Sequence, residues 1–339
     1  MSIVIIGSGI AGISLAEELR KLSPDQRVCV LTRETHGYYS RPLLSHGISR
    51  EDIESKIVLR TFASLRESGI EVRDGVDVRT IDRIAQAVTY TDGTNEYRHG
   101  YDRLVFASGS DALIPPPFLA HRSLFQVFNS LDDLLELRRL RGKVTSGNRT
   151  PRWAIVGGGL IGCELASDLA KAGDRVTLFH ALPRLMERQL EEEDSLTLAK
   201  VLQDSGVVLR LDSAVQGFRQ VAHAYGVELE EGPEGEYDGI VVACGFKPRI
   251  ALARSAGLPT SRGISVDDHL MTADPNIFAI GDVAECADGR IYAYILPIRS
   301  QALWLAKWFS GHVAHPWEPP VFKPKAKVHG FTAARPYLW

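Results

Sequence analysis

The feature that most constrains the fold of this chain is a strand followed by a glycine-rich turn and a helix. The apolar run at 3–6 predicts a buried strand, and Gly7-Ser8-Gly9-Ile10-Ala11-Gly12 follows it directly. Apolar residues then recur at helical spacing until Pro24, and a second apolar strand lies at 28–31. The segment predicts two adjacent parallel strands joined by a right-handed helical crossover.

The same order of elements occurs again in the middle of the chain. A strand at 153–156 leads into the turn Gly157-Gly158-Gly159-Leu160-Ile161-Gly162, a helix at 163–172 and a strand at 175–179. Strands that end in small residues follow each unit, at 101–110 and at 238–245. The chain is therefore expected to be an α/β protein with two Rossmann-like dinucleotide-binding domains.

Each glycine turn has the spacing and the context of a dinucleotide site. Glycines let a pyrophosphate approach backbone N–H groups at a helix N-terminus, where the helix dipole favours negative charge. Close packing of the glycines alone is the alternative. The residues expected to contact the cofactors here are Gly7, Gly9, Ala11 and Gly12 in the first turn, and Gly157, Gly159, Leu160, Ile161 and Gly162 in the second.

Acidic residues beyond the turns bear on the ribose contacts. Glu34 is placed to bind ribose hydroxyls at the first site, although a solvated glutamate after a strand is also common. At the second site His180 stands at the end of the corresponding strand, and no arginine pair follows it, although Arg184 is near. This pattern favours NAD(H) over NADP(H). We place Glu164 in the first turn of the second helix, where it is either stabilised by the helix dipole or in contact with the cofactor.

Composition limits the other classes of protein. The chain has 339 residues, a formal net charge of -3 and no apolar run of membrane-spanning length, so neither nucleic acid nor a membrane is expected as a partner. Nothing resembles a secretion signal, and the cytoplasm is the expected location. The four cysteines are widely spaced without a C-x-x-C pair, which predicts small buried residues, no metal site and no disulfide framework. We expect the basic stretch at 138–151 to be a linker or surface loop.

The order of the motifs resembles the FAD-dependent pyridine nucleotide-disulfide reductase superfamily. The carrying motifs are the two glycine turns, Ala107-Ser108-Gly109, Ala243-Cys244-Gly245 and Ile280-Gly281-Asp282. Finer stretches are similar to rubredoxin reductases and flavorubredoxin (nitric oxide reductase) reductases: Tyr39 to His46, Gly158 to Glu164, Gly245 to Arg249, and Leu296-Pro297-Ile298.

This resemblance implies the cofactor contacts outside the turns. Asp282 matches the aspartate that binds the FAD ribityl and pyrophosphate region, Arg41-Pro42 would border the flavin, and Leu296-Pro297 would lie along its ring. The alternative for Arg41 is a surface arginine fixed by a carboxylate. The expected set is completed by Ala107, Ser108, Gly109, Glu164, His180, Cys244, Gly245 and Gly281. No catalytic acid or base is predicted, because hydride transfer requires none.

The implied domains are an FAD-binding domain at 1–112 and 244–314, an NAD(P)H-binding domain at 113–243 and a remnant of a C-terminal interface domain at 315–339. The third domain would be largely absent. Unless a partner covers this region, Phe331, Tyr337 and Trp339 would then form an exposed apolar patch.

The predicted function is electron transfer from NADH through FAD to a rubredoxin-like or ferredoxin-like carrier. A rubredoxin or flavorubredoxin reductase is the leading interpretation. The alternatives are a ferredoxin reductase of an oxygenase system, a flavin-dependent NADH oxidase, and a flavin-binding redox sensor or interaction protein. The runs Arg138, Arg139, Arg141, Lys143 and Lys323, Lys325, Lys327 could dock an acidic carrier. Oligomeric state is not predicted.

Overall fold

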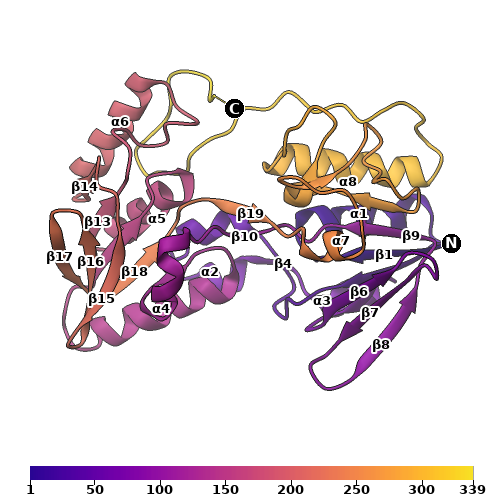
Figure 1. Ribbon diagram of the computed structural model, residues 1–339, viewed down its shortest axis with the longest axis horizontal. Helices are drawn as coiled ribbons and strands as arrows, with labels where there is room; N and C mark the ends of the chain where they lie inside the picture. Colours follow the sequence, from indigo (N-terminus) through magenta and orange to yellow (C-terminus); the bar gives the residue numbers. More distant parts are fainter. Residues whose placement is uncertain (339) are drawn as a thin grey trace. The chain divides into compact units, whose positions relative to one another are not determined.

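The computed structural model describes residues 1–338, which divide into two compact units (Figure 1). The first unit comprises Met1–Ser40, Val58–Asp111 and Lys247–Phe322, and the second comprises Arg41–Ile57, Ala112–Phe246 and residues 323–338. Trp339 lies outside the described residues. The expected domain boundaries placed 41–57 with the first nucleotide unit, whereas contacts group this segment with the second.

A five-stranded parallel sheet forms the centre of the first unit. Its strand order is β21-β9-β1-β2-β5, and every neighbouring pair is parallel. The glycine turn joins β1 to α1, as the sequence predicts, and the α1 stripe Ile13, Ala16 and Leu19 is buried. The elements are β1 (Ser2–Ile6), α1 (Ile10–Leu22), β2 (Arg27–Leu31), β5 (Glu71–Arg73), β9 (Arg103–Phe106) and β21 (Ile277–Ala279).

Further elements complete this core. Helix α8 packs against α1, and the antiparallel meander β6-β7-β8 contributes Ile81, Val88 and Tyr90 to the same hydrophobic cluster (Figure 1). The bounds are β3 (Tyr38–Tyr39), β4 (Val58–Arg60), α3 (Phe62–Glu67), β6 (Asp77–Asp82), β7 (Ala87–Thr91), β8 (Glu96–Gly100), α7 (Ala251–Ser255), β20 (Ile264–Ser265), η3 (Gly281–Val283), β22 (Ala284–Glu285) and α8 (Ile295–Phe309).

The second unit repeats the plan around a parallel sheet of order β11-β18-β12-β13-β14. Strands β10 (Ser110–Ala112) and β19 (Phe246–Pro248) lie where the chain passes from one unit to the other. The unit contains η1 (Arg41–His46), α2 (Ile53–Lys56), η2 (Pro116–Leu124), β11 (Gln126–Val127), α4 (Leu131–Thr145), β12 (Arg152–Val156), α5 (Leu160–Lys171), β13 (Arg175–Phe179), α6 (Glu192–Asp204), β14 (Val208–Arg210), β15 (Gly217–Val221), β16 (Ala224–Leu229), β17 (Gly232–Tyr237) and β18 (Gly239–Val242).

The basic stretch is not a loop over its first half, and that prediction was wrong. Residues 131–145 form α4, which begins with a capping box between Ser130 and Asp133. Leu131, Leu134 and Leu137 form its buried stripe. A cap and an apolar stripe outweigh the high charge of the exposed face, and only the residues after Thr145 leave the helix.

The C-terminal segment packs along the second unit without regular secondary structure among residues 323–338. The backbone N–H groups of Ala334 and Arg335 donate to the Asp194 carboxylate, each over 2.9 Å. Phe331 is buried, and the Tyr337 hydroxyl accepts a hydrogen bond from the Ala326 N–H. The expected exposed aromatic patch was therefore wrong for Phe331. Among the described helices, none has the length and apolar character needed to cross a bilayer.

Candidate dinucleotide-binding sites

The first glycine turn is closed by backbone on two sides and open on the third. A Cβ at Gly7 would lie 2.2 Å from the Ala107 oxygen, and one at Gly12 would lie 2.0 Å from the Gly7 oxygen. A Cβ at Gly9, the N-cap of α1, would meet nothing within 4 Å. The helix start has no side-chain cap, so its N–H groups are available to an anion.

The carboxyl ends of three strands bring the predicted FAD contacts of the first unit together. Gly7 follows β1, Ala107 follows β9, and Gly281 follows β21 after Ile280. A Cβ at Gly281 would lie 3.2 Å from the Ala11 Cβ, which places Asp282 next to the start of α1. The Asp282 carboxylate accepts a hydrogen bond of 2.8 Å from the Ser110 hydroxyl. Binding at this edge is typical of open parallel sheets.

The turn after β9 contains an unsatisfied polar atom. The Ser108 Oγ is buried and has no hydrogen-bond partner among the described residues, although the Ser108 carbonyl accepts from Arg249 over 3.0 Å. Gly109, the next residue, has a φ of 66° and accepts a backbone hydrogen bond from Arg249. A polar cofactor group would satisfy an atom of this kind, so these residues fit an FAD.

The other predicted residues of the first unit flank this edge. Glu34 lies beyond β2, and its carboxylate accepts a hydrogen bond of 2.9 Å from the Tyr39 hydroxyl. Leu296 and Pro297 fall in the first turn of α8, where Leu296 is 58% exposed and Pro297 is buried. An exposed leucine beside a buried proline provides an apolar surface that a planar ring could cover.

The second glycine turn has the same geometry in the other unit. A Cβ at Gly157 would lie 2.4 Å from the Ala243 oxygen, and one at Gly162 would lie 1.9 Å from the Gly157 oxygen. Gly159 is again the N-cap, and a Cβ there would meet nothing within 4 Å. Leu160 and Ile161 are half-buried residues in the first turn of α5. In both units, therefore, the helix N-terminus after the glycine turn has no side-chain cap and open space over its N-cap glycine.

His180 is fixed against this turn. Its Nδ1 accepts a hydrogen bond of 3.0 Å from the Gly158 N–H, and its Nε2 lies 3.2 Å from the Glu187 carboxylate. In a neutral ring the proton is therefore on Nε2, which donates to Glu187. Arg184 is occupied by the carbonyl oxygens of Leu190 and Glu187.

The sequence did not predict that Glu187 lies beside the second turn, because it is outside the usual spacing for an acidic residue near the ribose. In the first unit the Gly7 N–H donates to the Leu31 carbonyl, and in the second unit the Gly157 N–H donates to the Phe179 carbonyl. His180 therefore occupies the position that Thr32 has in the first unit. The Thr32 hydroxyl lies 2.8 Å from the Ser8 hydroxyl. Glu187 instead reaches the turn from the loop before α6. In the structure, the hydrogen bond to His180 identifies Glu187 as a neighbour of the second turn.

Glu164 does not lie in the first helical turn, so that placement was wrong. Helix α5 begins at Leu160 and has no acidic residue in its first turn. The Glu164 carboxylate is buried, and it accepts hydrogen bonds from the Ser45 hydroxyl at 2.5 Å and from the Lys327 N–H at 2.9 Å. The side chain thus links three segments of the second unit.

Segment η1 carries Arg41 and Pro42 within the second unit. The Arg41 guanidinium donates to the Asn129 carbonyl, and the Lys327 ammonium donates to the Pro42 carbonyl over 2.7 Å. The segment is anchored further by Asp168, which accepts from the N–H groups of Ile48 and Ser49. The structure thus groups the segment expected to border the flavin with the second glycine turn.

The cysteine sulfurs form no disulfide among the described residues. Cys29, Cys163 and Cys286 are buried as predicted, whereas Cys244 is half-buried after β18 and donates to the Val156 carbonyl. Burial raises the pKa of Cys244 to about 11 and that of Cys286 to about 12. Gly245, beside Cys244, accepts a hydrogen bond from the Leu113 N–H. Thiols held protonated in this way are poor nucleophiles.

Comparisons with known proteins agree with this geometry. The family described as pyridine nucleotide-disulphide oxidoreductase matches residues 1–302. The rubredoxin-NAD(+) reductase of Alcanivorax borkumensis is 35% identical over 91% of this chain and 78% of its own length. The nitric oxide reductase FlRd-NAD(+) reductase of Aliivibrio fischeri is 34% identical over 92% of this chain and 79% of its own. A solved ferredoxin reductase for the CYP199A2 system from Rhodopseudomonas palustris superposes with a TM-score of 0.85 at 26% identity, covering 94% of this chain and 78% of that one.

Proposed function

The chain belongs to the pyridine nucleotide-disulphide oxidoreductase family, and from this premise we propose that it transfers electrons from NADH through FAD to a rubredoxin-type carrier. The relatives named rubredoxin-NAD(+) reductase and FlRd-NAD(+) reductase support this reaction. We propose that the first unit binds FAD and the second binds the nicotinamide dinucleotide. The cytoplasmic location expected from the sequence stays a prediction.

One observation carries the proposal: each unit has its own open glycine turn. In both turns the outer glycines are required by backbone contacts, while the N-cap glycine faces free space. Packing alone would explain Gly7, Gly12, Gly157 and Gly162, but it gives no reason for the space over Gly9 and Gly159. Two pyrophosphate sites on one chain suit an enzyme that binds two dinucleotides.

The residues of the first unit would hold FAD through its polar regions. The N-terminus of α1 would bind the pyrophosphate, and Glu34 the ribose hydroxyls. Asp282 would accept hydrogen bonds from the ribityl region, with Ser110 holding the carboxylate in orientation. FAD, when bound, supplies the step between a two-electron donor and one-electron acceptors.

The residues of the second unit would hold NADH. The N-terminus of α5 would bind its pyrophosphate, and the His180–Glu187 pair stands near enough to the turn to contact the adenosine ribose. A carboxylate at this position would repel a 2′-phosphate, which supports NADH over NADPH. No side chain is assigned as an acid or base.

A disulfide-exchange reaction is less well supported. Such a reaction needs a thiolate, whereas burial raises the pKa of Cys29, Cys244 and Cys286 well above neutrality. A ferredoxin reductase of an oxygenase system is the second candidate, because the solved relative of that name superposes over most of the chain. The flavin-dependent NADH oxidase and the redox sensor stay alternatives.

The test is a comparison of acceptors with the purified FAD-loaded protein. NADH oxidation should be fast with rubredoxin or flavorubredoxin, slower with ferredoxin, and slow in air alone. Fastest turnover with ferredoxin would favour the second candidate, and fastest turnover with oxygen would favour an oxidase. A protein that binds FAD but is not reduced by NADH would contradict the proposal.

A further inference from the structure

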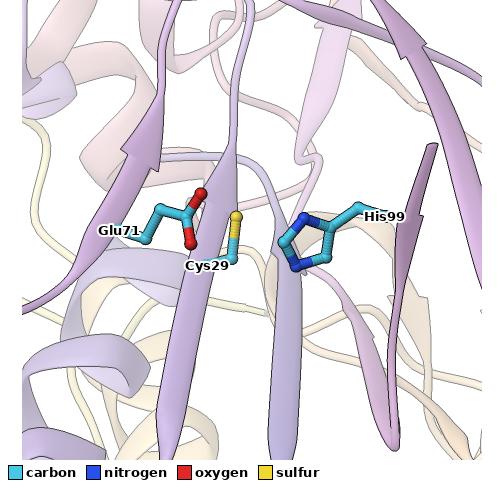
Figure 2. Close-up of side chains that lie close together, drawn as sticks. All are labelled: Cys29, Glu71 and His99. Carbon is cyan, nitrogen blue, oxygen red and sulfur yellow. The ribbon is translucent and has the colours of Figure 1, made fainter. Parts of the chain in front are cut away.

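Three side chains with metal-binding atoms meet in the first unit. Cys29 lies on β2, Glu71 on β5 and His99 on β8, and one ligand atom from each lies within 4.8 Å of the other two. Cys29 and Glu71 are register partners in the parallel pair of strands, while His99 comes from the meander. Figure 2 shows the Cys29 thiol between the Glu71 carboxylate and the His99 imidazole.

Two of the three ligand atoms are not engaged elsewhere. Cys29 is 2% exposed and His99 is half-buried, and neither side chain forms a hydrogen bond with another described residue. The Nε and Nη2 atoms of Arg73 lie 2.8 and 2.7 Å from the same Glu71 oxygen, Oε1. An ion could therefore bind the Cys29 thiol and the His99 imidazole without breaking a hydrogen bond between either group and the protein.

We propose that Cys29, Glu71 and His99 form a site for a divalent transition-metal ion that accepts sulfur and nitrogen ligands, with zinc as the representative. Zinc binds cysteine, histidine and carboxylate ligands, and three protein ligands would leave its fourth position to water. With bonds of about 2.3 Å to sulfur and about 2.0 Å to nitrogen, tetrahedral ligand atoms lie about 3.5 Å apart. The three ligand atoms lie within 4.8 Å of one another, so they must come closer together to bind one ion. The Glu71 side chain is 42% exposed and is free to make this movement.

Binding exchanges a proton for the ion without any change of oxidation state. A cysteine without a metal is mainly a thiol at neutral pH, whereas zinc binds the thiolate. Metal coordination forms a metal–sulfur bond and releases this proton to solvent, so affinity should rise with pH. Arg73 opposes the ion, because its charge is paired with the same carboxylate.

The proposed ion would join the edge strand of the sheet to the meander. Strand β5 is the last in the order β21-β9-β1-β2-β5, and β8 is the outer strand of β6-β7-β8. An ion bound only by the folded state stabilises that state. Zinc should therefore raise the melting temperature of the protein, independently of electron transfer.

Equilibrium dialysis of the metal-free, FAD-loaded protein against zinc chloride tests the site. The wild type should bind one zinc ion that Cys29→Ser and His99→Asn each weaken at least tenfold, and proton release on binding should be lost in Cys29→Ser. Cys286→Ser, which changes another buried thiol of the same unit, should bind as the wild type does. Arg73→Gln should bind several-fold more tightly, because it removes the competing charge.

The outcomes separate this site from adventitious binding. Flavin absorbance and circular dichroism identify folded variants, and His99→Asn provides the test if Cys29→Ser does not fold, since the His99 ring makes no hydrogen bond among the described residues. Zinc binding that is unchanged in His99→Asn would overturn the proposal. So would a wild type that binds no zinc, or one that binds it without a rise in melting temperature.

Discussion

The Ser45 hydroxyl donates a hydrogen bond of 2.5 Å to the buried carboxylate of Glu164. The carboxylate also accepts from the Lys327 N–H, so it joins η1 and the C-terminal segment to α5. Glu164→Gln would turn an amide group toward one of these donors. We expect the free energy of unfolding to fall by about 1–3 kcal/mol, measured by urea denaturation.

A matched control is available on α6. Glu192→Gln makes the same chemical change at an exposed position and should alter the free energy of unfolding by less than about 0.5 kcal/mol. Equal effects of the two substitutions would show that the buried hydrogen bonds of Glu164 do not contribute to stability.

The second glycine turn predicts two distinct phenotypes. Gly159→Val places its side chain in open space at a φ of −78°, which any residue adopts, so the protein should fold, bind FAD and lose reduction by NADH at least tenfold. Gly162→Val drives a Cβ toward the Gly157 oxygen and should destabilise the second unit itself. Stopped-flow reduction and thermal melting distinguish these effects. Normal NADH reduction in Gly159→Val would show that the turn is not the site.

Asp282 predicts a selective effect on FAD. Asp282→Asn retains the size of the side chain but removes its charge, and loss of a charge-assisted hydrogen bond costs about 1.5–3 kcal/mol. FAD should dissociate about 10- to 100-fold more readily, as measured by fluorescence of the released flavin. The NADH concentration that gives half-maximal reduction should stay the same, and an equal loss of both affinities would point to misfolding.

Much of the central fold follows from the sequence because strong local signals coincide there. The strands β1 and β12, the glycine turns and the helices α1 and α5 were predicted from apolar periodicity and glycine spacing. Those signals describe neighbouring residues. The C-terminal segment shows no periodicity, and its course depends on distant acceptors such as Asp194.

The contacts that the sequence did not predict share one physical cause. Helix α4 was missed because its charged face masks three buried leucines, and Glu187 because a loop brings it to His180. The neighbourhood of Cys29 and His99 depends on packing of the meander against the sheet. The spacing of residues along the chain does not predict contacts between segments that are far apart in the sequence.

His46 predicts loss of stability in mild acid. Burial lowers the pKa of His46 from 6.5, the neighbouring His329 and Lys327 act in the same direction, and Asp168 and Glu164 oppose the shift. Below about 6.5 the unfolded chain therefore binds a proton that the folded chain resists, and the free energy of unfolding falls as pH decreases. His46→Asn should reduce this slope, and exposed His312→Asn should not. Urea denaturation at pH 7.5 and at pH 5.5 gives the free energy of unfolding of each protein. If it falls by the same amount between these pH values in His46→Asn as in the wild type, the assignment is contradicted.

The basic runs differ in their capacity to dock an acidic carrier. Arg138 donates to the carbonyls of Gly47 and Arg50, and Arg141 pairs with the Asp174 carboxylate. Lys327 is half-buried against the Pro42 carbonyl, and burial lowers its pKa. These residues hold the second unit together, so they are poor test positions for docking.

The exposed residues are the test positions for docking. They are Lys323 and Lys325 in the C-terminal run, and Arg139 and Lys143 in the α4 run. Reversing both charges of the docking run should slow electron transfer to rubredoxin severalfold at low salt, because opposite charges accelerate encounter. Reduction of the flavin by NADH should not change, and added salt should remove the difference. Arg98→Glu, an exposed reversal on the meander of the first unit, is the control. If neither pair of reversals slows the transfer and salt has no effect, the carrier does not dock electrostatically at these two runs.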